Sequence, residues 1–117
     1  MANTPAPASE GHRAPFYAWA YVRAVPVAKR LGYALAIHGS CARDLDLVAI
    51  PWTSRAAHPR ALVDAFAEEF QGDFTGPGGE DGQEKPHGRR AWSISYGGGG
   101  FYIDLSVMPR TPVQGKV

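Results

Sequence analysis

The sequence predicts an α/β (α+β) fold in which a small mixed sheet of about four strands carries two helices on one face. Two observations support this fold class. Two segments have apolar side chains at the i, i+3, i+4 spacing of a helix, and four others alternate apolar and polar side chains as strands do. A chain of 117 residues has room for one domain, which we expect at 15–110, between a disordered tail at 1–14 and a C-terminal tail at 111–117.

The composition argues against several classes of protein. Lysine and arginine total 12 and aspartate and glutamate total 11, so the formal net charge is +1, without the basic excess of a dedicated nucleic-acid binder. The single cysteine, Cys41, cannot form an intramolecular disulfide or a multi-cysteine zinc site. No apolar run reaches the roughly 18 residues of a membrane span, and no secretory signal pattern is present. We therefore expect a cytoplasmic protein without a membrane partner.

The first helix is expected from Pro15 to Arg30. One face of this helix has residues at the i, i+3, i+4 spacing, namely Phe16, Trp19, Ala20, Arg23 and Val27. Basic residues at the end and Gly32 just beyond it are typical of a helix C-terminus. Pro26 lies inside this helix, so the helix is either kinked there or restarted with Pro26 in a new first turn.

The first two strands are expected at 33–38 and 44–50, joined by a short turn into a hairpin. The second helix follows at 59–70, with Pro59 in the first helical position and Gly72 as its C-cap. It should cover the same sheet face as the first helix.

The last two strands are expected at 91–96 and 101–108, with the glycines of 97–100 forming the hairpin turn. Before them, residues 71–88 contain six glycines and two prolines and no periodic apolar signal. This segment is longer than an ordinary connection, so we expect a flexible or functional loop.

Three aspartates are expected on the open face of the sheet. Asp44 and Asp46 are two residues apart and point the same way, while Leu45 and Leu47 point to the helices; Asp104 takes the equivalent position on the last strand. Clustered carboxylates raise one another's pKa, which a hard divalent cation relieves. The pattern therefore predicts a site for Mg²⁺ (or Mn²⁺), and the alternative is a row of solvated side chains.

A phosphate group is the second expected ligand. Gly39 permits close backbone approach and Ser40 supplies a hydroxyl and an amide, although the same pair also forms ordinary hairpin turns. A cationic cluster after the glycine-rich segment offers further phosphate donors, or else only a solubilising turn. Its members are Lys85, His87, Arg89 and Arg90.

Three other residues near these motifs have less specific interpretations. His38 is either a ligand or general base beside the turn or, more commonly, a hydrogen-bonded histidine at a strand end. Cys41 has no base or metal partner in the sequence and is interpreted as a small packed residue. Trp52 follows the acidic strand, so we expect it at the rim of the site.

The pattern Gly39-Ser40, then Asp44-Leu-Asp46, then Asp104 resembles the nucleotidyltransferase superfamily, which has the DNA polymerase beta-like fold. The resemblance implies that the Gly-Ser turn binds the phosphates of a nucleoside triphosphate. It also implies that the three aspartates are catalytic and hold the metal ions while a nucleotidyl group passes to a hydroxyl or related acceptor.

This resemblance covers residues 33–52 and 91–108. The run from His-Gly-Ser through Arg-Asp-Leu-Asp-Leu-Val is also similar to small bacteriophage proteins, which implies the host cytoplasm as the location. The family usually has a longer segment between Gly-Ser and the first aspartate than the three residues at 41–43.

Three functional hypotheses follow. The first is a minimal nucleotidyltransferase-like protein that binds a nucleoside triphosphate with magnesium and transfers the nucleotidyl group to an unknown acceptor. The second is a catalytically inactive module of the same fold that binds a nucleotide, a host protein or, through its open sheet face, a second copy of itself. The third, an RNA-binding domain, rests only on the cationic cluster and is opposed by the low net charge, so nucleic acid is expected only as an acceptor.

Overall fold

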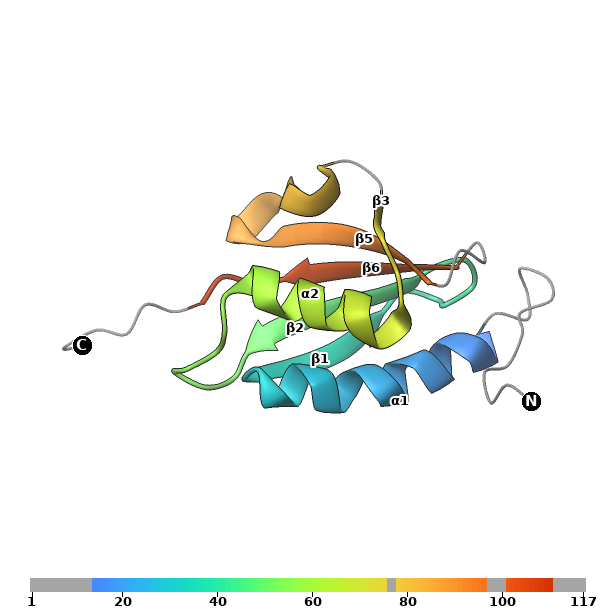
Figure 1. The fold of residues 1–117 in the computed structure, drawn as a ribbon, viewed down its shortest axis with the longest axis horizontal. Helices are drawn as coiled ribbons and strands as arrows, with labels where there is room; N and C mark the ends of the chain where they lie inside the picture. The colour runs from blue at the N-terminus through green and yellow to red at the C-terminus, as the bar shows by residue number, and fades with distance from the viewer. Residues whose placement is uncertain (1–13, 76–77, 97–100, 111–117) are drawn as a thin grey trace.

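The computed structural model describes residues 14–75, 78–96 and 101–110, and its fold is α+β. Two helices, α1 and α2, lie on one face of a single mixed sheet (Figure 1). The predicted tail at 1–14, apart from Ala14, lies outside the described residues, as do the turn at 97–100 and the tail at 111–117. The predicted fold class is confirmed.

The sheet has the strand order β1-β2-β6-β5-β3, and β4 also pairs with β5. The four long strands are those expected from alternation: β1 (Tyr33–His38), β2 (Leu45–Pro51), β5 (Arg90–Tyr96) and β6 (Phe101–Val107). β1 and β2 form the predicted antiparallel hairpin, β5 and β6 are also antiparallel, and β2 runs parallel to β6. The parallel pair brings together two segments that are distant in sequence.

Helix α1 (Ala14–Arg30) is a single helix that contains Pro26, so the helix is not restarted at the proline. A proline leaves the carbonyl four residues earlier without its helical partner. That carbonyl belongs to Val22, whose residue is 68% exposed, so water can satisfy it. The helix ends at its two basic residues as expected, and Gly32 follows with φ +88°.

Helix α2 (Pro59–Phe70) has the predicted bounds, but its C-cap is not Gly72. Gln71 takes the left-handed conformation with φ 52° and ends the helix. A Cβ on Gly72 would lie 1.7 Å from the Ser95 carbonyl oxygen of β5. Glycine is therefore required there because the chain passes close to β5, and not to cap the helix.

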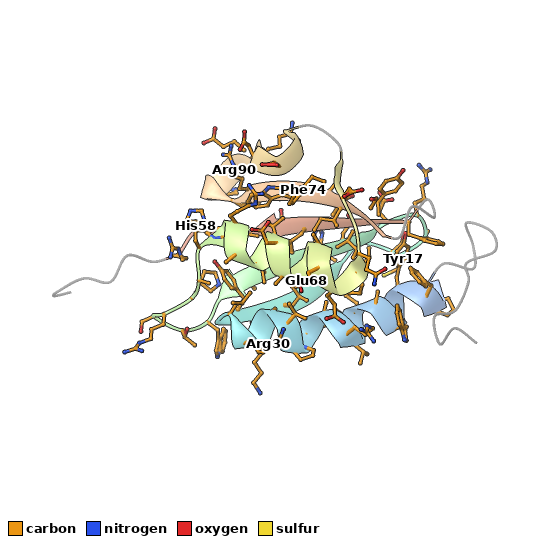
Figure 2. All side chains as sticks on the ribbon, in the orientation of Figure 1. Tyr17, Arg30, His58, Glu68, Phe74 and Arg90 are labelled. Atoms are coloured by element: carbon orange, nitrogen blue, oxygen red, sulfur yellow. The ribbon has the colours of Figure 1, made fainter. Side chains whose placement is uncertain are left out.

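The core lies between the two helices and the sheet. Apolar side chains of the long strands alternate toward the helices and are fully buried there, among them Leu45, Leu47 and Leu105. They pack against aromatic residues of both helices, including Phe16, Tyr17, Phe66 and Phe70. The Tyr17 hydroxyl (Figure 2) also donates a hydrogen bond of 2.6 Å to the Arg43 carbonyl, which anchors the turn before β2 to α1.

The segment expected to be an aperiodic loop at 71–88 contains short regular elements. They are β3 (Phe74–Thr75), the 3-10 turn η2 (Gly79–Asp81), β4 (Gln83–Glu84) and the 3-10 turn η3 (Pro86–Gly88). Both strands extend the sheet at the edge of β5. The Trp92 indole donates a hydrogen bond of 2.9 Å to the Glu80 carbonyl, which holds η2 against the sheet.

Candidate functional site

Two of the three predicted aspartates lie side by side. Asp46 of β2 and Asp104 of β6 are direct partners in the parallel register, and we call them the acid pair. Both point away from the helices, because their sequence neighbours Leu45, Leu47 and Leu105 are buried on the helix side. Both are half-buried and line a pocket of about 390 Å³ on the open face of the sheet, which we call the acid-pair pocket.

The surroundings of the pair favour a proton or cation between the two carboxyls. Burial raises the pKa of Asp46; the charge of Asp104 and a hydrogen bond to its carboxyl raise it further, whereas His38 lowers it. The Ser93 hydroxyl donates a hydrogen bond of 2.6 Å to Asp104 Oδ1. This hydrogen bond holds the Asp104 carboxyl in position next to Asp46.

Asp44 is less closely associated with this pair. It lies one residue before the first residue of β2, and its charge is the smallest of the contributions that raise the pKa of Asp46. Within residues 14–75, 78–96 and 101–110, no group of three or more histidine, cysteine, aspartate or glutamate side chains is placed to hold a metal ion together. The geometry thus offers two adjacent carboxylates.

The Gly39-Ser40 turn follows β1 and touches the acid pair. Gly39 has φ +91°, and a Cβ there would lie 2.7 Å from Asp46 Oδ2. The Ser40 hydroxyl accepts a hydrogen bond of 3.2 Å from the Ala42 amide, so it stabilises its own turn. Glycine at position 39 therefore allows the backbone to approach the Asp46 carboxylate.

The neighbouring Cys41 is half-buried and packs against the core. Burial first, and the charge of Asp46 second, raise the pKa of the Cys41 thiol. A raised pKa disfavours the thiolate, which is the reactive form of cysteine. The geometry therefore fits a packed residue better than a nucleophile.

The predicted cationic cluster is divided by the fold. Lys85 and Arg89 line the acid-pair pocket, where one guanidinium nitrogen of Arg89 donates a hydrogen bond of 2.7 Å to the Ser106 hydroxyl. Arg90 instead lines a different pocket, and its Nε donates to the Asp81 carbonyl at 2.7 Å. His87 is exposed and lines neither of these two pockets.

Two serines that sequence reasoning left without a role complete the acid-pair pocket. Ser93 holds Asp104, and Ser106, only 6% exposed, holds Arg89. The period of two along β5 and β6 puts both serines on the face that carries Asp104, so alternation is the signal that could have identified them.

The expectation that Trp52 lies at the rim of this site is wrong. β2 runs from Leu45 to Pro51, so Trp52 follows the end of the strand that is farther from Asp46. Its side chain is 76% exposed and lines an apolar pocket with residues of α1 and β1, including Val25 and Leu35.

Comparisons with known proteins give no further assignment. No protein family, no curated protein and no solved structure matches the chain at a significant level. None of the helices among the described residues is long and apolar enough to cross a membrane.

Proposed function

We propose that the chain is a minimal nucleotidyltransferase-like protein that binds a nucleoside triphosphate together with Mg²⁺ or Mn²⁺ on the open face of the sheet. The observation that carries this proposal is the set of charged residues that line the acid-pair pocket. Asp46 and Asp104 lie in register on adjacent strands, and Lys85 and Arg89 line the same pocket of about 390 Å³. Two anions beside two cations match a metal ion coordinated to phosphate groups.

The donor set fits a hard divalent cation. Mg²⁺ is commonly held by one or two carboxylates together with substrate phosphates and water, so Asp46 and Asp104 are sufficient ligands. The raised pKa of Asp46 reflects partial burial and a like charge. A bound cation would offset both effects, because it stabilises the ionised carboxylate. When bound, the metal would supply charge neutralisation at the phosphates and polarise the phosphoryl group.

The residues of the chain have separate roles in this proposal. Arg89, held by Ser106, and Lys85 bind phosphate oxygens opposite the acid pair. Ser93 orients the Asp104 carboxyl. The Gly39 backbone lies against Asp46, so the turn adjoins the acid pair, although neither Gly39 nor Ser40 lines the acid-pair pocket.

The proposal is tested by thermal unfolding with Mg²⁺ alone, ATP alone and both together. The expected result is a stabilisation by the pair of ligands that exceeds the sum of their separate effects. Asp46→Asn should abolish this excess, and Asp73→Asn should retain it, because Asp73 is exposed and lines none of the described pockets. An identical response of wild type and Asp46→Asn would refute the proposal, whichever nucleotide is used.

A second candidate is a nucleotide-binding module of the same fold without catalysis. Two observations favour it: only residues 41–43 separate the turn from Asp44, and the Ser40 hydroxyl is bonded within its own turn. Both candidates require binding, so pyrophosphate release distinguishes them. Release above background with a candidate acceptor supports transfer, and tight binding without release across a panel of acceptors supports the module.

A further inference from the structure

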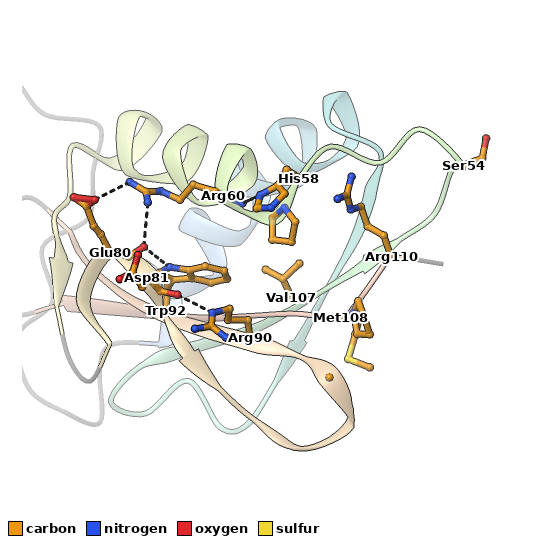
Figure 3. A pocket seen from close by; sticks show the side chains of 13 residues that line it. Ser54, His58, Arg60, Glu80, Asp81, Arg90, Trp92, Val107, Met108 and Arg110 are labelled. Atoms are coloured by element: carbon orange, nitrogen blue, oxygen red, sulfur yellow. Dashed lines mark hydrogen bonds and ion pairs between the residues drawn. The ribbon is translucent and has the colours of Figure 1, made fainter. Parts of the chain in front are cut away.

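A second and larger cavity lies on the helix side of the sheet. It encloses about 780 Å³ between the start of α2, the η2 turn and the end of β6 (Figure 3), and we call it the helix-side pocket. Alternation along the strands separates it from the acid pair. Arg89 and Ser106 line the acid-pair pocket, whereas their neighbours Arg90 and Val107 line this one, and Trp92 borders both. Its volume is within the usual range for small-molecule sites, about 300–1,000 Å³.

The middle of this pocket is apolar. Pro59 at the start of α2, Val107 near the end of β6 and Met108 beyond it contribute to the lining. Val107 is buried, while Pro59 and Met108 are partly exposed and can contact a ligand. Such a surface suits the hydrocarbon or ring portion of a ligand.

Acidic residues and arginines lie together at one end of the pocket. Figure 3 shows Glu80 and Asp81 together at one end, with the Arg60 side chain extending toward them. Arg60 forms ion pairs with Asp64 at 2.9 Å and with Glu80 at 3.5 Å. Arg90 bonds the Asp81 carbonyl and helps to hold η2 in place. At this end, the Glu80 carboxylate is therefore paired with Arg60, and Arg90 fixes the η2 backbone.

The opposite end carries the positive charge of Arg110, which has no carboxylate partner among the described residues. Arg110 donates a hydrogen bond of 3.3 Å to the Ala56 carbonyl, which is neutral. Among residues 14–75, 78–96 and 101–110, no carboxylate forms an ion pair with Arg110. A guanidinium has five N–H donors, so several remain available after this single bond.

His58 adds a donor at the same end (Figure 3). Its Nδ1 accepts a hydrogen bond of 3.1 Å from the Arg60 amide, as the N-cap of α2. A neutral imidazole that accepts at Nδ1 carries its proton on Nε2, which is then a donor. The local arrangement thus presents a cation and a neutral donor beside an apolar surface.

We propose that the helix-side pocket binds a small organic anion whose acidic group lies at Arg110 and His58 and whose apolar body rests on Pro59, Val107 and Met108. The complementary chemistry is a phosphate, sulfonate or carboxylate attached to a hydrophobic ring or chain. This site is distinct from the proposed triphosphate site, because Arg110 and His58 line only the helix-side pocket, whereas Asp46 and Asp104 line only the acid-pair pocket. Its ligand is a second ligand of the protein rather than a reactant at the acid pair.

The test uses anilinonaphthalene sulfonate, a fluorescent probe with aromatic rings and one sulfonate. Its uncharged relative phenylnaphthylamine serves as the ligand control. We expect saturable one-to-one binding of the sulfonate, competition by inorganic phosphate and much weaker binding of the uncharged probe. Arg110→Gln should weaken sulfonate binding about tenfold, because it removes one charge-assisted contact.

Two further variants test whether binding depends on this site rather than on the overall positive charge of the protein or on the loss of its fold. Arg30→Gln removes an exposed arginine at the end of α1 and should leave binding unchanged. His58→Asn keeps an N-cap acceptor but loses the imidazole donor, so binding should weaken severalfold without loss of the fold. Thermal unfolding checks that each variant is folded.

Three results would overturn the proposal: equal binding of both probes, equal weakening by Arg110→Gln and Arg30→Gln, or no saturable binding by wild type. Saturating magnesium and ATP should not displace the sulfonate. Displacement that persists in Asp46→Asn would mean that ATP itself occupies the helix-side pocket, which would contradict the separation of the two sites. Failure of the triphosphate proposal leaves the probe experiment unaffected.

Discussion

Gly39→Ala is the substitution that most directly connects the turn with the acid pair. Gly39 has φ +91°, in the region that L residues avoid at a cost of about 1–2 kcal/mol. Alanine also restricts the unfolded chain, which offsets about 0.4–1 kcal/mol. The net loss from the backbone is therefore about 1 kcal/mol, or a fall in melting temperature of about 4–8 °C for a domain of this size.

The new methyl group also affects the site. It would lie 2.7 Å from Asp46 Oδ2, so the carboxylate must rotate away from the turn. Because the carboxylate is the far end of a side chain, this movement changes the free energy of unfolding little, but it disturbs the alignment of Asp46 with Asp104. The variant should fold, with lower stability and a reduced response to magnesium and ATP.

Gly79→Ala is the matched control. Gly79 has a positive φ of +51°, and a Cβ at this position would have no atom within 4 Å, so the substitution introduces comparable strain without a contact. Thermal unfolding followed by circular dichroism, with and without magnesium and ATP, compares the two variants. If Gly39→Ala and Gly79→Ala lose similar stability and respond equally to the ligands, the proposed link between the turn and Asp46 is refuted.

Three other substitutions probe the sheet. Because burial and a neighbouring carboxyl raise the folded-state pKa of Asp46, its contribution to stability falls as pH rises from the unfolded value toward the folded one. Asp46→Asn should therefore raise the free energy of urea unfolding at pH 7 by about 0.5–2 kcal/mol, and no gain would contradict this. Gly72→Ala should destabilise by at least about 1–3 kcal/mol, since its Cβ would lie 1.7 Å from the Ser95 carbonyl; wild-type stability would contradict the close approach. Ser106→Ala removes the acceptor that holds Arg89 and should weaken triphosphate binding in calorimetry more than it changes stability; unaltered affinity would exclude this positioning role.

The acid pair shows which features of the candidate site can be predicted from the sequence. Alternation in β2 predicts that Asp46 points away from the buried Leu45 and Leu47, and the structure confirms it. The exact partner of Asp46 could not be predicted, because the pairing of β2 with β6 depends on packing between distant segments. Asp44 was grouped with Asp46 on the assumption that the strand began one residue earlier than it does.

The structure of the glycine-rich segment at 71–88 could not be predicted from sequence patterns. Strands of two residues, such as β3 and β4, are too short to show alternation, so they were not expected. Gly72 was taken as a helix cap because glycine is common there, but its role comes from contact with β5, which is distant in sequence. Arg89 and Arg90 were placed together as neighbours, although β5 begins at Arg90 and adjacent residues near a strand point to opposite faces.

The central claim is that Asp46 and Asp104 together hold a divalent metal ion that also contacts a triphosphate. Crystals soaked with Mn²⁺ and a non-hydrolysable ATP analogue test it most directly, since manganese is located by its anomalous scattering. We predict an anomalous peak between the two carboxylates, with phosphate oxygens completing its coordination and Arg89 contacting the phosphates. A bound analogue elsewhere, or carboxyls that remain hydrogen-bonded to each other without manganese, would contradict the account.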